Sequence, residues 1–305
     1  MKSSIKLNNN KIMPILGLGT WQSPKGSVGR AVQYALVEAN YKHIDCASIY
    51  KNEKEIGSAL HGVFSKRKIK RSDIFITSKL WNTEHNPKNV EKACKQTLKD
   101  LRLDYLDLYL VHWGIAFVHG LLPEPLNVLG LAKTENVPMQ DTWGAMENLV
   151  KKGLVKSVGV ANFTAPMLLD LFTYARIKPA VNQIEIHPYN SQQALVEYCK
   201  KMKVAITAYS PLGSTGKIAE KPLSDPTVIR IAHSHKKTPA QVLIRWLLQR
   251  EIIAIPKSTK TNRIDENSEV FDFALSAKEM KSIYSLNKNK RFVDPSMWWG
   301  VPYFQ

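Results

Sequence analysis

Eight short runs of apolar and β-branched residues alternate with helical segments along almost the whole chain of 305 residues. The runs occupy residues 15–19, 42–45, 74–79, 106–112, 155–161, 181–187, 204–209 and 252–256, and the helical segments that follow them occupy 28–40, 53–64, 87–101, 141–152, 166–174, 192–201, 226–249 and 262–270. Strict alternation predicts a parallel sheet with right-handed crossovers, and eight strands are the number that closes a (β/α)8 barrel. We therefore expect an α/β fold, a (β/α)8 TIM barrel, built as one domain over residues 1–305.

Three segments do not belong to a bare barrel. Residues 1–13, with an asparagine turn at 8–10, predict a short hairpin that caps the bottom of the barrel. Residues 114–140 form a long loop after the fourth strand, on the face where barrel enzymes place their active sites. The tail at 291–305 is rich in aromatic residues, among them Trp298, and we expect it to pack over a pocket or an interface.

Local signals define several helix ends. Asn40 and Gly153 follow predicted helices, and both residue types tolerate the left-handed conformation that a helix end needs. Thr238 before Pro239 has the pattern of an N-cap followed by proline at the first helical position. We therefore expect two helices within 226–249.

The chain is strongly basic, with 43 Lys and Arg against 26 Asp and Glu and a formal net charge of +17. Such a charge favours anionic partners such as nucleic acid, a membrane surface or a phosphorylated ligand. The densest basic run, at 66–71, has no aromatic residues between its charges and is interpreted as a solvated loop, so nucleic acid is not expected as a partner.

Three cysteines, Cys46, Cys94 and Cys199, form no C-x-x-C pair, so neither a disulfide framework nor a metal site is predicted. Residues 1–10 lack the apolar core of a signal peptide, and no stretch reaches the roughly 18 apolar residues of a membrane span. We expect a soluble cytoplasmic protein that does not enter membranes.

Titratable side chains stand at the ends of three neighbouring strands. The second strand ends at Asp45, with Tyr50 five residues later, the third at Lys79 and the fourth at His112. Taken singly, Asp45 suits a turn cap, Lys79 a surface lysine and His112 a core histidine. Four such groups converging at the catalytic face of a barrel are harder to explain by packing, and they predict a catalytic site.

Together these groups have a chemical logic. A buried lysine beside a tyrosine is expected to lower the phenol pKa from about 10, since the cation favours phenolate. Asp45 would keep Lys79 charged, and a neutral His112 would orient a substrate carbonyl. Such a group of side chains can protonate a carbonyl oxygen while a cofactor transfers hydride to the carbonyl carbon. Tyr50 and Lys54 also match the Y-x-x-x-K pattern of short-chain dehydrogenases, but the glycine-rich dinucleotide turn of that family is missing.

The segment 255–267 combines lysine, hydroxyl and arginine side chains after the eighth strand. Such a set at a helix N-terminus predicts an anion site, and the alternative is a solvated basic loop. Lys257 and Arg263 suit a 2′-phosphate and hence NADPH. Glu266 and Asn267 would hydrogen-bond an adenine amine.

The sequence also contains candidate partners for the nicotinamide end of a bound dinucleotide. Tyr209 would stack on a nicotinamide, with Gln183 and Asn162 on its carboxamide. Three tryptophans that follow strand ends would form the walls of an apolar substrate cleft; they are Trp21, Trp81 and Trp113.

Long motifs, in order, resemble the aldo-keto reductase superfamily and its aldose/aldehyde reductase-like branch over nearly the whole length. They are Gly17-Leu18-Gly19-Thr20-Trp21, Tyr41 to Ala47 leading to Tyr50, Asn52-Glu53 with Ile56-Gly57, Ser78-Lys79-Leu80-Trp81, Leu103 to Trp113, Gln183-Ile184-Glu185, Tyr209-Ser210-Pro211-Leu212-Gly213 and the segment 255–267.

The resemblance implies a monomeric, cytoplasmic barrel that uses NADPH/NADP+ to reduce a small-molecule carbonyl substrate. Its catalytic tetrad falls on Asp45, Tyr50, Lys79 and His112. The implied cofactor residues are Thr20, Trp21, Asp45, Asn162, Gln183, Tyr209, Ser210, Leu212, Ser214, Lys257, Ser258, Thr259, Arg263, Glu266 and Asn267, and the implied substrate residues are Trp21, Tyr50, Trp81, His112, Trp113 and Trp298. The alternative is a catalytically weak NADP(H)-binding protein with a structural or regulatory role, as some relatives are.

The chain departs from the family pattern at several positions. Ala161 stands where serine is usual before the carboxamide-binding Asn162, which predicts weaker or altered nicotinamide contacts. Gly114 replaces a frequent proline and is expected to loosen the start of the long loop. Lys260 replaces a common threonine and is expected to strengthen the preference for NADP(H).

Overall fold

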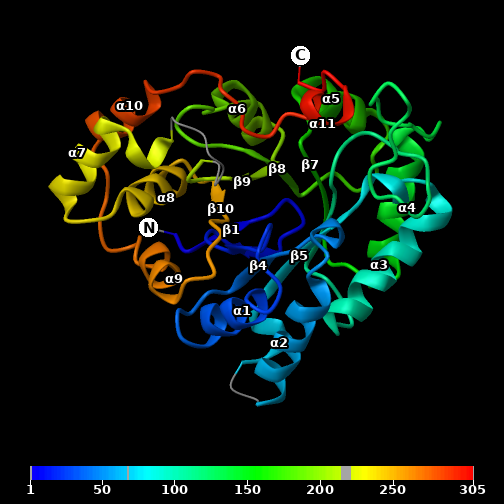
Figure 1. Ribbon diagram of the computed structural model, residues 1–305, viewed down its shortest axis with the longest axis horizontal. Coiled ribbons are helices and arrows are strands. Elements are labelled where there is room, and N and C mark those ends of the chain that lie inside the picture. Colours follow the sequence, from blue (N-terminus) through cyan, green and yellow to red (C-terminus); the bar gives the residue numbers. More distant parts are fainter. Residues whose placement is uncertain (1, 67–68, 214–220, 305) are drawn as a thin grey trace.

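Eight parallel strands form the centre of the computed structural model, which describes residues 2–66, 69–213 and 221–304. Each strand pairs with the next one along the chain; in order they are β3 (Leu18–Gly19), β4 (His43–Asp45), β5 (Phe75–Leu80), β6 (Leu108–Val111), β7 (Val158–Ala161), β8 (Val181–Glu185), β9 (Ala205–Tyr209) and β10 (Ile253–Ala254). Parallel bridges from Leu16 to Ala254 and from Gly19 to Lys257 join the first and last strands. The predicted (β/α)8 barrel is therefore confirmed (Figure 1).

Helices surround the strands, as the periodicity predicts. They are α1 (Val28–Val37), α2 (Glu53–Ser65), α3 (Pro87–Leu101), α4 (Met139–Lys151), α5 (Ala165–Tyr174), α6 (Gln193–Lys201), α7 (Pro226–His235), α8 (Pro239–Gln249) and α9 (Thr261–Ser268). The sequence interpretation missed α10 (Ala277–Tyr284) and the short α11 (Ser296–Trp299). Ser276 and Glu279 form a capping box at α10, so a local signal for this helix was present.

The predicted helix ends have the expected backbone. Asn40 and Gly153 have φ angles of 54° and 71°, in the left-handed region. The first helix ends earlier than the predicted 40, at Val37. Thr238 accepts a hydrogen bond from the backbone N–H of Gln241, and this cap separates α7 from α8.

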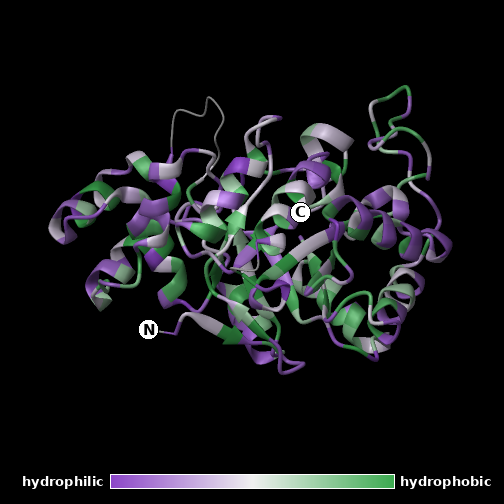
Figure 2. Ribbon diagram, turned by 90° about the horizontal axis from the view of Figure 1, so that it is seen from below, coloured by the Kyte–Doolittle hydropathy of each residue, from purple (hydrophilic) through white to green (hydrophobic). Residues whose placement is uncertain are grey.

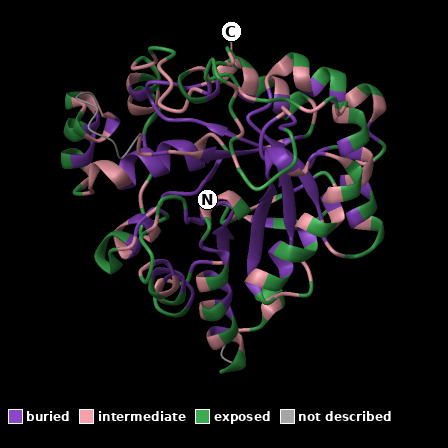
Figure 3. Ribbon diagram, turned by 45° about the vertical axis from the view of Figure 1, so that its right-hand side comes forward, coloured by how far each residue is buried: buried purple, intermediate pink, exposed green. Residues whose placement is uncertain are grey.

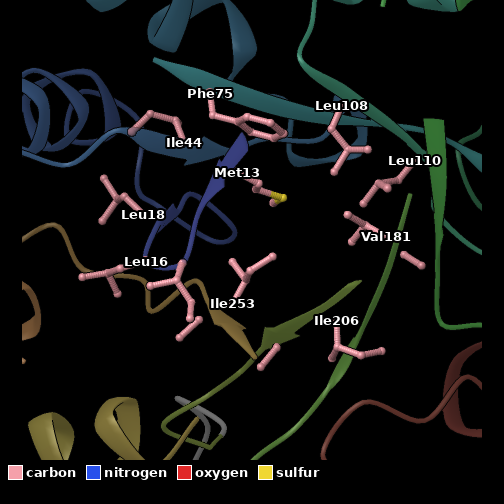
Figure 4. Close-up of a cluster of buried hydrophobic side chains, with 14 of the residues drawn as sticks. Met13, Leu16, Leu18, Ile44, Phe75, Leu108, Leu110, Val181, Ile206 and Ile253 are labelled. Atoms are coloured by element: carbon pink, nitrogen blue, oxygen red, sulfur yellow. The ribbon is translucent and has the colours of Figure 1, made fainter. Parts of the chain in front are cut away.

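The N-terminal hairpin closes one end of the barrel. Its strands β1 (Ser4–Lys6) and β2 (Ile12–Pro14) are antiparallel. Asn8 at its turn donates to the carbonyl of Pro179 at 2.9 Å. Met13 is fully buried, and Figure 4 shows it among Phe75, Leu108, Leu110 and other strand side chains. The hairpin thus covers this end of the barrel and also supplies an apolar side chain to the barrel core.

Burial follows the layers of the fold. The barrel strands are largely buried, and most helices are buried on one side and exposed on the other, whereas α8 is buried along most of its length (Figure 3). The helices accordingly alternate hydrophobic and hydrophilic residues (Figure 2). No helix in the described part of the chain has the length and apolar character needed to cross a bilayer.

The three cysteines, Cys46, Cys94 and Cys199, are all free and buried. Burial raises the pKa of the Cys46 thiol well above its ordinary value. The same cause raises the pKa values of Cys94 and Cys199 to about 12. These thiols therefore stay protonated at neutral pH.

Replacing Met13 with alanine should lower the free energy of unfolding by about 2–5 kcal/mol, because the change leaves a cavity in the barrel core. Urea denaturation followed by circular dichroism measures the loss. Met297→Ala is the matched control, since Met297 is 82% exposed. Equal effects of the two changes would contradict a core role for the hairpin.

Candidate active site

The four residues of the expected tetrad meet at the carboxyl ends of three adjacent strands. Asp45 is the last residue of β4, Lys79 lies in β5, and His112 follows β6 directly. Tyr50 ends a short 3-10 turn, Ser48–Tyr50, after β4. The barrel topology thus brings together side chains that are up to 67 residues apart in the sequence.

The ammonium group of Lys79 is enclosed and fully hydrogen-bonded. Its Nζ lies 2.5 Å from Asp45 Oδ1, 2.9 Å from the carbonyl oxygen of Cys46 and 3.3 Å from the hydroxyl of Tyr50. An ammonium has three protons, so these three acceptors satisfy it. Burial acts to lower the pKa of Lys79, but Asp45 and Tyr50 outweigh it and raise that pKa to about 12. The lysine is therefore a permanent cation beside the phenol.

The pKa of Tyr50 differs from the expectation. Burial raises it to about 12, although the charge of Lys79 and its hydrogen bond act to lower it. The prediction of a lowered phenol pKa is therefore wrong for the protein without ligands. The sequence shows that a cation is near, but the cost of burying a phenolate depends on the folded surroundings.

His112 is neutral, as expected. Burial, and secondly the charge of Lys79, hold its pKa well below the ordinary value. The rings of Trp81 and Tyr50 lie 5.1 and 6.0 Å from the imidazole, both edge-on. Asn162 donates to the backbone carbonyl of His112 at 3.0 Å. The imidazole therefore stands in an aromatic setting as a neutral hydrogen-bonding group.

The amide residues assigned to a nicotinamide already have protein partners. Gln183 donates to the second carboxylate oxygen of Asp45 at 2.7 Å. Asn162 has a left-handed backbone, φ 63°, and accepts a hydrogen bond from the hydroxyl of Tyr209 at 2.7 Å. These contacts fix both amides and the Tyr209 ring in place.

Thr20, which directly follows β3, forms hydrogen bonds at the same site. Its hydroxyl donates to the carbonyl of Asp45 at 2.8 Å, and Asn52 donates to the carbonyl of Thr20 at 2.9 Å. Asn52 and the carbonyl of Cys46 are contacts that sequence reasoning did not assign. A backbone carbonyl leaves no signal in a sequence, whereas Asn52 stands in one of the recognised motifs.

An aromatic cluster lies beside His112. Trp81, Trp113, Phe117 and Trp299 are buried together, and the ring of Trp299 lies 5.2 Å from that of Trp113. Trp298, the tail residue expected to contact substrate, is 42% exposed, and its ring lies 6.2 Å from that of Trp299. The tail packs on this cluster through Trp299. Of the other expected cleft tryptophans, Trp21 is also 42% exposed.

Gly114, which is expected to loosen the start of the long loop, is hydrogen-bonded to the tail. Its backbone N–H donates to the hydroxyl of Tyr303 at 2.7 Å. A Cβ at this position would lie 2.1 Å from Cε of Met167, so any side chain would displace the packing. Proline would also remove the donor. Glycine therefore allows a tie between the start of the loop and the tail.

The basic segment after β10 lies at the start of α9. Lys257 is half-buried, and its Nζ gives one hydrogen bond to the carbonyl of Gln22 at 3.1 Å. Arg263 is exposed, Glu266 half-buried and Asn267 buried. Among the described residues, α9 has no side-chain cap at its N-terminus.

The remaining expected cofactor residues have varied placements. Ser258 is buried and accepts a hydrogen bond from the backbone of Lys260, whereas Thr259, Ser210 and Leu212 are half-buried. Ser214, and Arg67 and Lys68 of the basic run, lie outside the described residues.

Known proteins resemble this chain over nearly its full length. Residues 15–288 match the Aldo/keto reductase family. Aldo-keto reductase family 1 member A1-A of Danio rerio is 48% identical over 303 residues, covering 97% of this chain and 93% of that protein. The Rattus norvegicus family 1 member A1 is 46% identical over 299 residues, covering 96% and 92%.

Solved structures agree with these sequence matches. The aldose reductase from Schistosoma japonicum superimposes with a TM-score of 0.93 at 48% identity, covering 99% of this chain and 98% of that one. The aldose reductase from Giardia lamblia gives 0.90 at 44% identity, covering 95% and 98%.

Tyr50 should remain protonated at pH 10.5 in the ligand-free protein, where an ordinary tyrosine with a pKa of about 10 is mostly ionised. Carbon-13 NMR of ζ-labelled tyrosine measures this, with the Tyr50→Phe spectrum as the assignment control and circular dichroism as the check of folding. A Tyr50 midpoint below 10 would show that the lysine outweighs burial.

Proposed function

The chain belongs to the aldo/keto reductase family, and from this premise we propose that it is an NADPH-dependent reductase of aldehydes and ketones. The observation that carries the proposal is the hydroxyl of Tyr50, 3.3 Å from an ammonium that Asp45 keeps charged. Such a pair suits a proton donor that must leave a stable anion behind. The neutral imidazole of His112 stands next to it.

The residues of the basic segment fit the phosphate of a dinucleotide. Lys257 has two ammonium protons left after its bond to Gln22, and Arg263 is free to approach an anion from solvent. The uncapped N-terminus of α9 adds backbone N–H groups and the positive end of a helix dipole. Lys257 bridges to Gly19, next to Thr20 of the catalytic face, so the segment adjoins that face.

Each residue of the tetrad has a part in the proposed reaction. NADPH, when bound, supplies the hydride that adds to the carbonyl carbon. Tyr50 donates its proton to the carbonyl oxygen, which becomes the alcohol hydroxyl, and Lys79 stabilises the phenolate that remains. Asp45 fixes the ammonium in place. The phenol recovers a proton from solvent before the next turnover.

His112 and the aromatic cluster hold the substrate in this proposal. A neutral imidazole donates one N–H to the carbonyl oxygen without competing as a cation for the phenol proton. Trp81 and Trp113 provide apolar walls and keep water from the reacting carbonyl. The neutral surroundings favour substrates whose carbonyl group is attached to an apolar body.

The proposal also covers the domain organisation, oligomeric state and cellular compartment of the protein. One barrel domain spans residues 1–305 and acts as a monomer in the reducing cytoplasm. Free, buried cysteines suit that compartment.

Tyr50→Phe should lower kcat for aldehyde reduction by about 10²–10⁴-fold, because the proton donor is lost. NADPH consumption at 340 nm over a panel of small aldehydes measures activity, and quenching of protein fluorescence measures NADPH binding, which should be retained. Tyr105→Phe, at the other end of the barrel, is the matched control and should leave kcat unchanged.

Two outcomes would contradict the proposed function. Full activity in Tyr50→Phe would remove Tyr50 as the acid. A wild-type protein that binds NADPH and reduces no carbonyl compound would favour the structural or regulatory alternative.

Lys257→Met with Arg263→Met should raise the KM for NADPH at least tenfold and leave the KM for NADH nearly unchanged, because charge-assisted bonds to the 2′-phosphate are lost. Steady-state kinetics with both cofactors measure the ratio. Lys236→Met with Arg230→Met removes the same charge from α7 and its end, and should change neither constant. An equal rise of the KM for NADPH and the KM for NADH would show that Lys257 and Arg263 do not bind the 2′-phosphate.

A further inference from the structure

A second pocket lies outside the catalytic centre. It has a volume of about 510 Å3 and lies between the first residues of α5 and α6 and the segment that leads from α10 into the tail. Figure 1 shows α5, α6 and the C-terminal end on the same side of the molecule. None of Asp45, Tyr50, Lys79 and His112 lines it. The volume is in the range of small-molecule sites.

Among the described residues that line this pocket, Arg291 is the only charged one. Its Nη2 donates to Oε1 of Gln192 at 3.1 Å, and its guanidinium lies 3.7 Å above the ring of Phe304. Its Nη1 is buried and has no hydrogen-bond acceptor among the described residues. Arg291 is half-buried, and a cationic guanidinium that lines a pocket favours an anionic ligand there, because a charge-assisted hydrogen bond is stronger than a neutral one.

Glu185, one of the acidic residues whose charge acts on Arg291, forms its hydrogen bonds elsewhere. Glu185 accepts hydrogen bonds from the backbone N–H groups of Phe292 and Val293, at 2.7 and 3.0 Å. Its carboxylate also contacts Nε2 of His187 at 2.7 Å. Within the described part of the chain, no ion pair joins Arg291 to a carboxylate. Arg291 therefore lines the pocket with a charge that no carboxylate of the described residues pairs with directly.

Two helices add positive potential to the same pocket. Thr164 and Ala165 at the start of α5 line it, as do Gln192 and Gln193 at the start of α6. Neither helix has a side-chain cap among the described residues. The first turn of α6, and that of α5 apart from Pro166, therefore keep backbone N–H groups without a side-chain cap, and both dipoles present their positive ends.

Part of the lining is apolar. Phe163, Ile184, Tyr198 and Phe304 provide aromatic and aliphatic surface beside the guanidinium. A free inorganic anion would leave this surface wet, whereas an organic anion would cover it. The fork of the guanidinium also matches the planar geometry of a carboxylate.

We propose that this pocket is a second ligand site, which binds a small organic carboxylate with an aromatic or aliphatic body. The carboxylate pairs with Arg291 and the helix N-termini, and the body contacts Phe163, Ile184 and Phe304. The site is separate from the proposed catalytic centre, so its occupancy is measured by binding and not by turnover.

Isothermal titration calorimetry of the full chain with 2-naphthoate tests the site. Arg291→Met should weaken binding at least tenfold, because the charged partner is lost. Arg230→Met, an exposed arginine on α7, is the matched control and should bind as the wild type does. Ala194→Trp should also weaken binding at least tenfold by filling the pocket while Arg291 is kept. Thermal unfolding of each variant checks that its fold is intact.

Two further probes separate the ligand classes. The neutral isostere 2-naphthalenemethanol should bind at least tenfold more weakly than 2-naphthoate. Inorganic phosphate that bound as tightly as 2-naphthoate and depended on Arg291 would overturn the organic class. If the wild type does not bind 2-naphthoate at millimolar concentration, the proposed ligand site is wrong. It is also wrong if the wild type, Arg291→Met and Ala194→Trp bind 2-naphthoate equally tightly.

Discussion

The enclosed ammonium of Lys79 is the constraint on which the catalytic face depends. A buried charge is tolerated only when its partners satisfy it completely, and removal of one partner is strongly destabilising. Asp45 on the neighbouring strand, the Cys46 carbonyl and the Tyr50 hydroxyl supply these partners. Gln183 then holds the other oxygen of Asp45 from the far side of the barrel. The buried ammonium is therefore stable only in the closed barrel. The closed barrel in turn fixes the position of the Tyr50 phenol.

Much of this arrangement could be predicted from the sequence because it follows from topology. Once strands and helices alternate, the carboxyl ends of neighbouring strands meet at one face, so Asp45, Lys79 and His112 must converge. The pKa of Tyr50 could not be predicted, because it depends on how much water the folded site excludes. Neither could the choice of Trp299 over Trp298, since adjacent residues of a tail carry no pattern that says which one packs inward.

The tail is held by interactions that are distant in sequence. Glu185, at the end of β8, binds the backbone where the tail begins, and Gly114 binds Tyr303 near its end. Between these two points Trp299 enters the aromatic cluster, and its carbonyl accepts the N–H of Ala132 from the long loop. Loop and tail thus form one wall, and a change in either would reach the other through Trp299.

The buried cysteines have a meaning for a protein proposed to handle aldehydes. Carbonyl electrophiles react with thiolates, and a thiolate requires exposure and a low pKa. Here burial keeps the thiols of Cys46, Cys94 and Cys199 protonated and out of reach. Reactive carbonyl compounds that entered the catalytic face of the barrel would therefore meet no exposed thiolate among the three cysteines.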